Sequence, residues 1–468
     1  MQRGRSMAAA AGRAIARRLG ALPPPAILGI GWALLLVFAY PGMMTQDSFD
    51  HLREMRNGVY SDSHPPAISL IWKVIDYVIA GQLGMLLLQT GTFLAGLYYL
   101  LRRVFAPRRA AWVAVAVFLF PPVMNPMGVI WKDCLMAGFL ALGAAGLLSE
   151  RRGRRLLGLA AMFGAMAVRY NALGATLPLV VLLFEWRPGM HWLPRHALST
   201  AAWLATTFAA FGLNKAITDV EMHYWHSSLA IYDIVGTLAH VDEDLPDAEL
   251  RELLAGTELV IDKDIHATAR SAYSTRDFFP IVNSDKYAMW AVPINGYVPA
   301  PQAQRDAIGR AWWDTIARYP GAYVRHRIAV TAEVIGLGEV AAAGAVTKRD
   351  FRWPGFANEM GLGTGWSKLQ RKLSRWMRAL QRNTPIFVPY VYLVAALLFL
   401  PLAIRQRDAL ALLLSGLGME GTLVLLAHSN DYRYSHWMVI CTILGAILLG
   451  ARRYRAAAPP GPPPAAPV

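Results

Sequence analysis

Long apolar blocks run along this chain, and short polar connections separate them. Blocks of this length, with most charges confined to the connections, predict membrane-spanning α-helices. The predicted spans cover residues 26–40, 82–99, 111–123, 134–148, 156–168, 173–184, 198–213, 386–404, 409–427 and 437–449. The expected fold is an all-α polytopic membrane protein with about 10–11 transmembrane helices, juxtamembrane helices and a mostly α outer (periplasmic) domain.

Three further segments have mixed patterns. Residues 67–80 are apolar but short and charged, which predicts a helix at the outer interface. Residues 328–346 carry two glutamates, so they are either a span or a re-entrant or surface-lying element. Residues 366–382 place tryptophan, leucine and methionine on one helical face and Lys or Arg elsewhere, which is typical of an interfacial helix.

Composition agrees with a membrane protein. Hydrophobic residues make up 55% of the chain and charged residues only 16%, against about 25% charged in soluble domains. The net charge of +15 comes from bases in short connections such as Arg102-Arg103 and Arg151–Arg155. This positive-inside pattern predicts cytoplasmic loops there and gives no sign of nucleic-acid binding. Both cysteines, Cys134 and Cys441, lie in apolar runs, so no disulfide framework is expected.

These patterns divide the chain into five regions. The first apolar run follows several arginines, but no small-residue cleavage site follows it, so we interpret it as an uncleaved helix with a cytoplasmic N-terminus. The predicted regions are a basic cytoplasmic segment, 1–25; a transmembrane catalytic region, 26–213, with a first outer loop at 41–66; an outer domain, 214–384; the C-terminal transmembrane helices, 385–452; and an Ala/Pro-rich disordered tail, 453–468.

Unusual polar groups collect at the predicted outer ends of the spans. They are Asp47 and Asp50 in the first loop, Lys132 and Asp133, Arg169 and Asn171, and Arg433 between the last spans. Ionisable residues at membrane depth are costly and often functional. Each also has a structural reading: an interface anchor for Lys132 and Asp133, a helix end for Arg169, a loop ion pair with Asp431 for Arg433, and a turn for His64. Their common membrane face favours a site.

This set of side chains suits transfer chemistry on a lipid-linked phosphate. Arginine and lysine bind phosphate oxygens and stabilise the charge that develops on a leaving phosphate. An aspartate beside a sugar carbon can accept the proton of an incoming hydroxyl. We therefore expect a general base in the first loop and a phosphate clamp at the later helix ends.

Asp47 followed by His64-Pro65-Pro66 resembles the C-type glycosyltransferase superfamily, and most closely its protein O-mannosyltransferase and aminoarabinose-transferase branch. The resemblance covers residues 28–213 in layout. It implies a polyprenyl-phosphate-linked sugar donor, an envelope acceptor (lipid, glycan or protein), membrane lipid around the chain, and inverting transfer on the periplasmic face of the cytoplasmic membrane. Asp47, supported by Asp50, matches the catalytic acid, and His64 begins a juxtamembrane helix.

One residue departs from that family's pattern, because Ser48 follows Asp47 where the mannosyltransferases have a glutamate. This departure favours an acceptor other than protein. Metal dependence varies within the superfamily, so a divalent ion is left open as a cofactor and no metal ligand is assigned. The remaining alternatives are an envelope polysaccharide polymerase or ligase, a lipid-linked sugar transporter and a non-catalytic scaffold.

Overall fold

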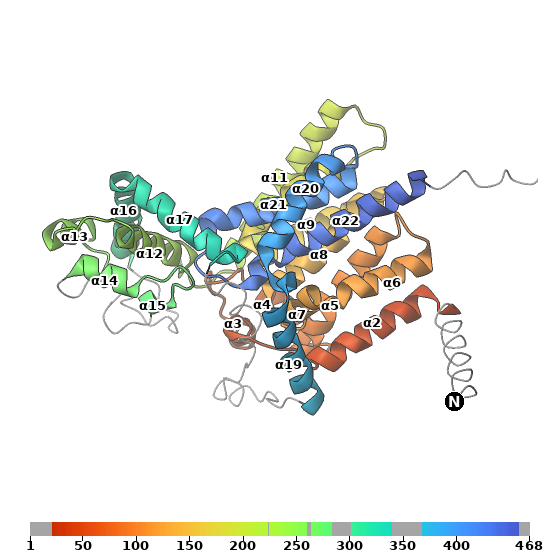
Figure 1. Ribbon diagram of the computed structural model, residues 1–468, viewed down its shortest axis with the longest axis horizontal. Coiled ribbons are helices and arrows are strands. Elements are labelled where there is room, and N and C mark those ends of the chain that lie inside the picture. Colours follow the sequence, from red (N-terminus) through yellow and green to blue (C-terminus); the bar gives the residue numbers. More distant parts are fainter. Residues whose placement is uncertain (1–20, 223, 260–263, 283–300, 339–366, 458–468) are drawn as a thin grey trace, which may run out of the picture.

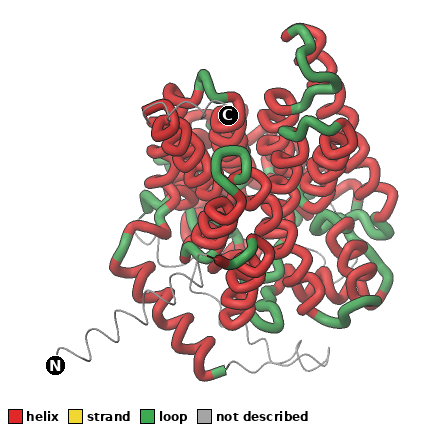
Figure 2. Tube along the Cα trace, turned by 90° about the vertical axis from the view of Figure 1, so that its right-hand side faces the viewer, coloured by secondary structure: helices red, strands yellow, loops and turns green. Residues whose placement is uncertain are grey.

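The computed structural model describes residues 21–222, 224–259, 264–282, 301–338 and 367–457 of the 468-residue chain. In these ranges every regular element is a helix, and only isolated bridges pair extended segments (Figures 1 and 2). The predicted all-α character is confirmed for the described residues. Long apolar segments with few β-turn signals favour this outcome, since a helix satisfies its own backbone hydrogen bonds in an apolar surrounding.

The apolar blocks form one bundle with one large hydrophobic core. Its helices are α2 (Pro24–Ala39), α5 (Gln82–Leu101), α6 (Pro107–Phe118), α7 (Pro121–Met127), α8 (Lys132–Leu147), α9 (Arg152–Val168), α10 (Leu173–Leu183), α11 (Trp192–Ile217), α20 (Pro389–Ala403), α21 (Arg407–Leu426) and α22 (His436–Ala457). Small residues let these helices approach closely. A Cβ on Gly158 of α9 would lie 2.6 Å from the backbone nitrogen of Leu147 on α8.

Three helices are long and apolar enough to cross a membrane: α5, α21 and the helical stretch Tyr432–Tyr454. A fourth is reached if α6 and α7 count as one span. The structure therefore supports an α-helical membrane protein, while the larger count remains a prediction. Residues 111–123, predicted as one span, are in fact broken, with a bend of 73° between α6 and α7. Pro121 and Pro122 explain the break, because proline disfavours helix at the preceding residue.

The basic connections meet at one end of the bundle. Arg103 donates to the carbonyl of Leu148 at 2.8 Å, and Arg155 donates to the carbonyl of Trp186 at 3.3 Å. Arg452 pairs with Asp408 through both guanidinium nitrogens, at 2.7 and 2.5 Å. The helix ends that the positive-inside pattern assigns to one side of the membrane thus lie together.

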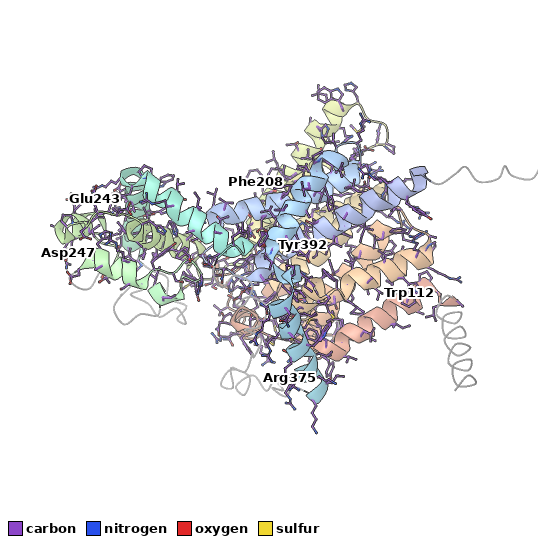
Figure 3. All side chains as sticks on the ribbon, viewed as in Figure 1. Trp112, Phe208, Glu243, Asp247, Arg375 and Tyr392 are labelled. Atoms are coloured by element: carbon purple, nitrogen blue, oxygen red, sulfur yellow. The ribbon has the colours of Figure 1, made fainter. Side chains whose placement is uncertain are left out.

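A second hydrophobic core lies at the opposite end (Figure 1, left). It is formed by α12 (Tyr224–Ala239), α13 (Asp247–Leu253), α14 (Ile265–Ala272), α15 (Phe279–Val282), α16 (Gln302–Arg318) and α17 (Pro320–Ile335), together with the end of α21. Figure 3 labels Glu243 and Asp247 at its far edge and Trp112 of α6 toward the basic end. The segment predicted at 328–346 begins inside α17, which packs on α12 and α21 and does not meet the length and hydropathy expected of a span; residues 339–346 lie outside the described ranges.

Three helices lie beside the bundle at the end nearer the second core: α3 (Gln46–Asn57), α4 (Ala67–Asp76) and α19 (Lys368–Asn383). Helix α4 confirms that residues 67–80 contain a helix, while its place at the outer interface remains a prediction; its buried Trp72 donates to the carbonyl of Gly81 at 3.1 Å. Helix α19 matches the amphipathic helix predicted at 366–382, although Trp366 is not among the described residues.

Candidate functional site

The loop predicted to be the first outer one contains helix α3, and the start of this helix is fixed by hydrogen bonds. Thr45 precedes α3, and its backbone N–H donates to the Ser48 hydroxyl at 3.0 Å. The same hydroxyl donates to the carbonyl of Ile130 at 2.6 Å, and Trp131 donates to the Thr45 hydroxyl at 2.9 Å. These bonds fasten the first turn of α3, which carries Asp47, to the residues just before α8.

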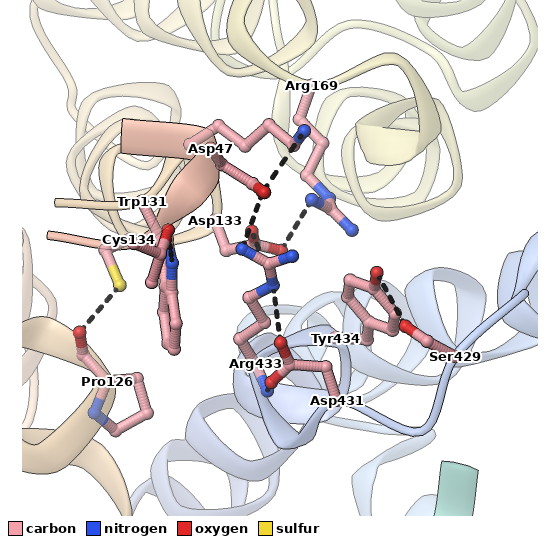
Figure 4. Close-up of polar contacts among 12 residues, drawn as sticks. Asp47, Pro126, Trp131, Asp133, Cys134, Arg169, Ser429, Asp431, Arg433 and Tyr434 are labelled. Carbon is pink, nitrogen blue, oxygen red and sulfur yellow. Dashed lines mark hydrogen bonds and ion pairs between the residues drawn. The ribbon is translucent and has the colours of Figure 1, made fainter. Parts of the chain in front are cut away.

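Asp47 lies between two cations from distant parts of the chain. Its Oδ2 accepts a hydrogen bond from Arg433 Nη1 at 2.7 Å and lies 3.8 Å from Lys132 Nζ (Figure 4). All three side chains are mostly buried, with exposed fractions of 22% for Asp47, 12% for Lys132 and 11% for Arg433. Burial by itself raises the pKa of Asp47, but the positive charges of Arg433 and Lys132 outweigh it and hold the pKa well below its usual value.

The cluster continues on its other side through Asp133. This buried carboxylate lies 2.8 Å from Arg169 Nη1 and 4.0 Å from Arg433 Nε, and Arg433 Nε is also 3.0 Å from Asp431 (Figure 4). The Arg433 guanidinium packs near the rings of Trp131 and Tyr434. Three carboxylates and three cations from α3, α8, the α9–α10 corner and the loop before α22 therefore form one compact, charge-balanced cluster.

His64 joins this cluster through Lys132. Lys132 Nζ lies 2.6 Å from His64 Nδ1, and a lysine ammonium only donates, so Nδ1 accepts. Burial first, and the charge of Lys132 next, lower the pKa of His64 well below its usual value. His64 therefore stays neutral near pH 7. It also packs against the ring of His51, with 5.0 Å between ring centroids.

Two residues that the sequence analysis missed complete this side of the site. His51 contacts the Ser69 hydroxyl through Nδ1 at 3.2 Å, while its buried Nε2 has no hydrogen-bond partner among the described residues. Glu54 accepts from the hydroxyls of Ser61 and Ser69, each at 2.8 Å. Positions 47, 51 and 54 share one helical face, so the signal was present, but it is visible only once this loop is recognised as a helix.

Asp50 and Asn171 lie outside the ion cluster. Asp50 accepts from Gln46 at 3.0 Å and lies 3.6 Å from Arg53, so its partners belong to α3 itself. Burial, and then the nearby charge of Asp47, raise the pKa of Asp50 to about 6. Asn171 follows Arg169, but its amide donates to Thr422 on α21 at 3.4 Å. Its position indicates a helix–helix contact, so its predicted role in binding substrate gains no support here.

The other predicted residues, Asp47, His64, Lys132, Asp133, Arg169 and Arg433, all meet in this cluster. Among the residues that the structure describes, no group of three or more His, Cys, Asp or Glu side chains is arranged to hold a metal ion. No family model, curated protein or solved structure matches the chain.

Proposed function

We propose that this chain is a membrane glycosyltransferase that moves a sugar from a polyprenyl-phosphate donor to an envelope acceptor with inversion. The observation that carries the proposal is the contact between Asp47 of the first loop and Arg433, which lies 386 positions later. It puts a carboxylate beside guanidinium and ammonium groups near the ends of the bundle helices. The carboxylate can accept the proton of an acceptor hydroxyl, and the guanidinium and ammonium groups can bind a lipid phosphate.

The proposed reaction is a single displacement. The acceptor oxygen attacks the anomeric carbon, and the bond from that carbon to the phosphate oxygen breaks. Polyprenyl phosphate leaves with the bonding electron pair, and Asp47 takes the acceptor proton. Arg433, Arg169 and Lys132 stabilise the charge on the leaving phosphate, and the planar arginine forks suit two phosphate oxygens at once.

The charge balance of the resting cluster adds a step before transfer. Each cation already faces a carboxylate, so an incoming phosphate competes with Asp47 for Arg433 and Lys132. When these cations turn to the phosphate, the pKa of Asp47 rises because the charges that lowered it are neutralised. Donor binding would then convert a weak base into an effective one at the place where the base is needed.

The alternatives differ in their product. A lipid-linked sugar transporter would also need intramembrane charge, but it moves its cargo without forming a glycosidic bond. A polymerase or ligase would join whole glycans. Purified protein in nanodiscs, given labelled polyprenyl-phosphate sugars and envelope extract, separates these cases by the chemical identity of the labelled product.

The first test compares two variants in which an aspartate of α3 is replaced by asparagine. Asp47→Asn should lower the transfer rate by about a hundred- to ten-thousand-fold, the usual contribution of a general base. It should leave donor binding intact or make it tighter, because Asp47 competes with the donor phosphate for Arg433 and Lys132. Asp50→Asn should have a much smaller effect, since its partners lie on α3. If Asp50→Asn abolished transfer while Asp47→Asn stayed active, the general base would be Asp50. Near-normal transfer by both variants would reject the mechanism.

The second test addresses the clamp. Arg169→Lys and Arg433→Lys keep the positive charge but lose the planar guanidinium that can bind two phosphate oxygens at once. Each variant should therefore weaken donor binding and transfer. Arg270→Lys is the matched control, because Arg270 lies on the surface of the second core in an exposed pair with Asp244. Normal donor affinity and rate in both cluster variants would remove the clamp assignment.

A further inference from the structure

Helix α19 carries three parallel stripes of different chemistry. Positions spaced by four, three and four residues share one face of an α-helix. One such series is Gln370, Ser374, Met377 and Gln381; the next is Leu369, Leu373, Trp376 and Leu380; the third is Arg371, Arg375, Arg378 and Arg382. The leucine–tryptophan stripe and the arginine stripe therefore flank the first stripe on its two sides.

The first stripe faces the protein. Gln370 donates to the carbonyl of Tyr40, at the end of α2, at 2.6 Å, and Met377 and Gln381 are 2% and 3% exposed. In Figure 1, α19 crosses the end of α2 and projects beyond the bundle. Because α2 is one of the apolar helices of the bundle, this contact fixes α19 at the level where apolar helix gives way to polar loop.

The apolar stripe is partly open, because Leu373 and Leu380 pack against the core of the bundle and the other two residues do not. Leu369 and Trp376 are each 50% exposed, although both are large and apolar. Exposed aromatic and leucine side chains on an amphipathic helix at this level are typical of contact with the boundary between lipid headgroups and acyl chains.

The arginine stripe is strongly and uniformly charged. Lys368 and Lys372 add to the four arginines, and no acidic residue occurs between positions 368 and 383. Arg371, Arg375 and Arg382 are exposed, and Figure 3 shows Arg375 at the edge of the molecule. Like charges at this helical spacing repel one another. An anionic partner outside the helix would therefore stabilise the exposed Arg371, Arg375 and Arg382.

We propose that the arginine stripe of α19 binds the phosphate groups of anionic phospholipids in the leaflet where the helix lies. The exposed Leu369 and Trp376 favour lipid over a soluble anion or a protein, because they lie on the same helix as the arginines, on the other side of the protein-facing stripe. Arginine holds phosphate oxygens bidentately, and several bases near an anionic surface act together. The inference does not rest on the proposed glycosyl transfer.

A fluorophore on the helix can report the lipid around it. Both native cysteines are buried, so an introduced Ala379→Cys, exposed and outside all three stripes, takes the label selectively. The full-length labelled protein is placed in phosphatidylcholine nanodiscs that contain equal small fractions of spin-labelled phosphatidylglycerol or spin-labelled phosphatidylcholine. Phosphatidylglycerol should quench the fluorophore about twofold more strongly, because the arginines concentrate it locally.

Variants then test the arginines themselves. Arg371→Gln, Arg375→Gln and Arg382→Gln combined should make the two lipids quench equally, and folding is not at stake because all three side chains are exposed. The control combines Arg310→Gln, Arg318→Gln and Arg325→Gln, which are exposed arginines on α16 and α17, and should keep the preference. Equal quenching in the unaltered chain, a preference that survives the α19 variant, or quenching by neither lipid would each overturn the proposal.

Discussion

Asp47 faces a conflict between its two proposed tasks. A general base works best with a pKa near the working pH, yet Arg433 and Lys132 keep the pKa of Asp47 well below its usual value against the opposing effect of burial. The proposed donor resolves the conflict because its phosphate takes the same cations. If the acceptor bound before the donor, Asp47 would still be a weak base, and it would not take the proton of the acceptor hydroxyl.

His51 offers a test of the buried site that is independent of the reaction. Burial first, and the charge of Lys132 next, lower the pKa of His51 from 6.5 to about 3. Below about pH 6.5 the His51 imidazole therefore binds a proton in the unfolded chain but stays neutral in the folded chain. Folding stability consequently falls as the pH drops from about 6.5 toward 3. Each pH unit costs up to about 1.4 kcal/mol for one such group.

His51→Gln should reduce this acid sensitivity, because glutamine can still bond Ser69 and does not titrate. The thermal midpoint of the detergent-solubilised protein should drop less between pH 7.5 and pH 5 in this variant than in the unaltered chain. Exposed His191→Gln serves as the control and should drop as far as the unaltered chain. Equal drops in all three proteins would show that His51 is not held neutral by burial.

At the scale of elements, the long apolar runs of the sequence predict α5, α8, α9, α10 and α21 closely, since length and hydropathy alone set such helices. The runs mislead where local chemistry overrides hydropathy, as at the Pro121–Pro122 break. Helix α3 was missed for the opposite reason. Its mean composition is polar, and one face is buried only through tertiary contacts such as Ser48 with Ile130.

The convergence of the site residues was predicted from topology alone, because alternating spans bring every second connection to one face. Their pairing could not be predicted. Which carboxylate meets which cation depends on side-chain directions that only the packed helices define. For example, Arg169 and Asn171 are only two positions apart, yet Arg169 pairs with Asp133 and Asn171 contacts Thr422.

A buried ion pair joins the second core to the loop that carries Arg433. Arg327 on α17 donates to Asp233 on α12 at 3.1 Å and to the carbonyls of Val424 and Ala427 at 3.0 and 2.9 Å. Nearby, residues 276–278 pair with residues 428–430 through two backbone hydrogen bonds. The helices of the second core thus hold the last turn of α21 and the start of the loop before α22.

Asp233→Asn should destabilise the protein strongly, because it leaves the Arg327 guanidinium buried without its counter-charge. Breaking one partner of a buried pair costs about 3–5 kcal/mol. Asp242→Asn is the matched control: Asp242 also lies 3.1 Å from an arginine, Arg325, but its side chain is 90% exposed against 1% for Asp233. The thermal midpoint should fall clearly in the first variant and stay unchanged in the second. Equal midpoints would show that the ion pair does not hold the helices of the second core in place.

Over the whole molecule, charge separates the two ends of the bundle. One end carries the arginine contacts of the helix connections, including the pair of Arg452 with Asp408. The other end carries the balanced cluster around Asp47 and the acidic outer region with Glu243. Since bases in short connections remain on the cytoplasmic side, this separation predicts the orientation of the chain: the cluster and the outer helices face outward, and the connection between α10 and α11 faces the cytoplasm.

Cysteine labelling tests this orientation, and the structure selects the positions. Ser61 lies in the first outer loop but is only 2% exposed, so it is a poor target. Asn57, Glu243 and Pro188 are exposed, the first two at the predicted outer face and the third between α10 and α11. In intact spheroplasts an impermeant maleimide should label Asn57→Cys and Glu243→Cys, and it should reach Pro188→Cys only after permeabilisation. The buried Cys134 and Cys441 should contribute little background.

Labelling of Pro188→Cys alone in intact spheroplasts would invert the orientation and put the Asp47 cluster on the cytoplasmic side, where an envelope acceptor could not reach it. Labelling of all three before permeabilisation would mean that residues 57 and 188 lie on the same side, which contradicts the assignment of the bundle's two ends to opposite faces of the membrane.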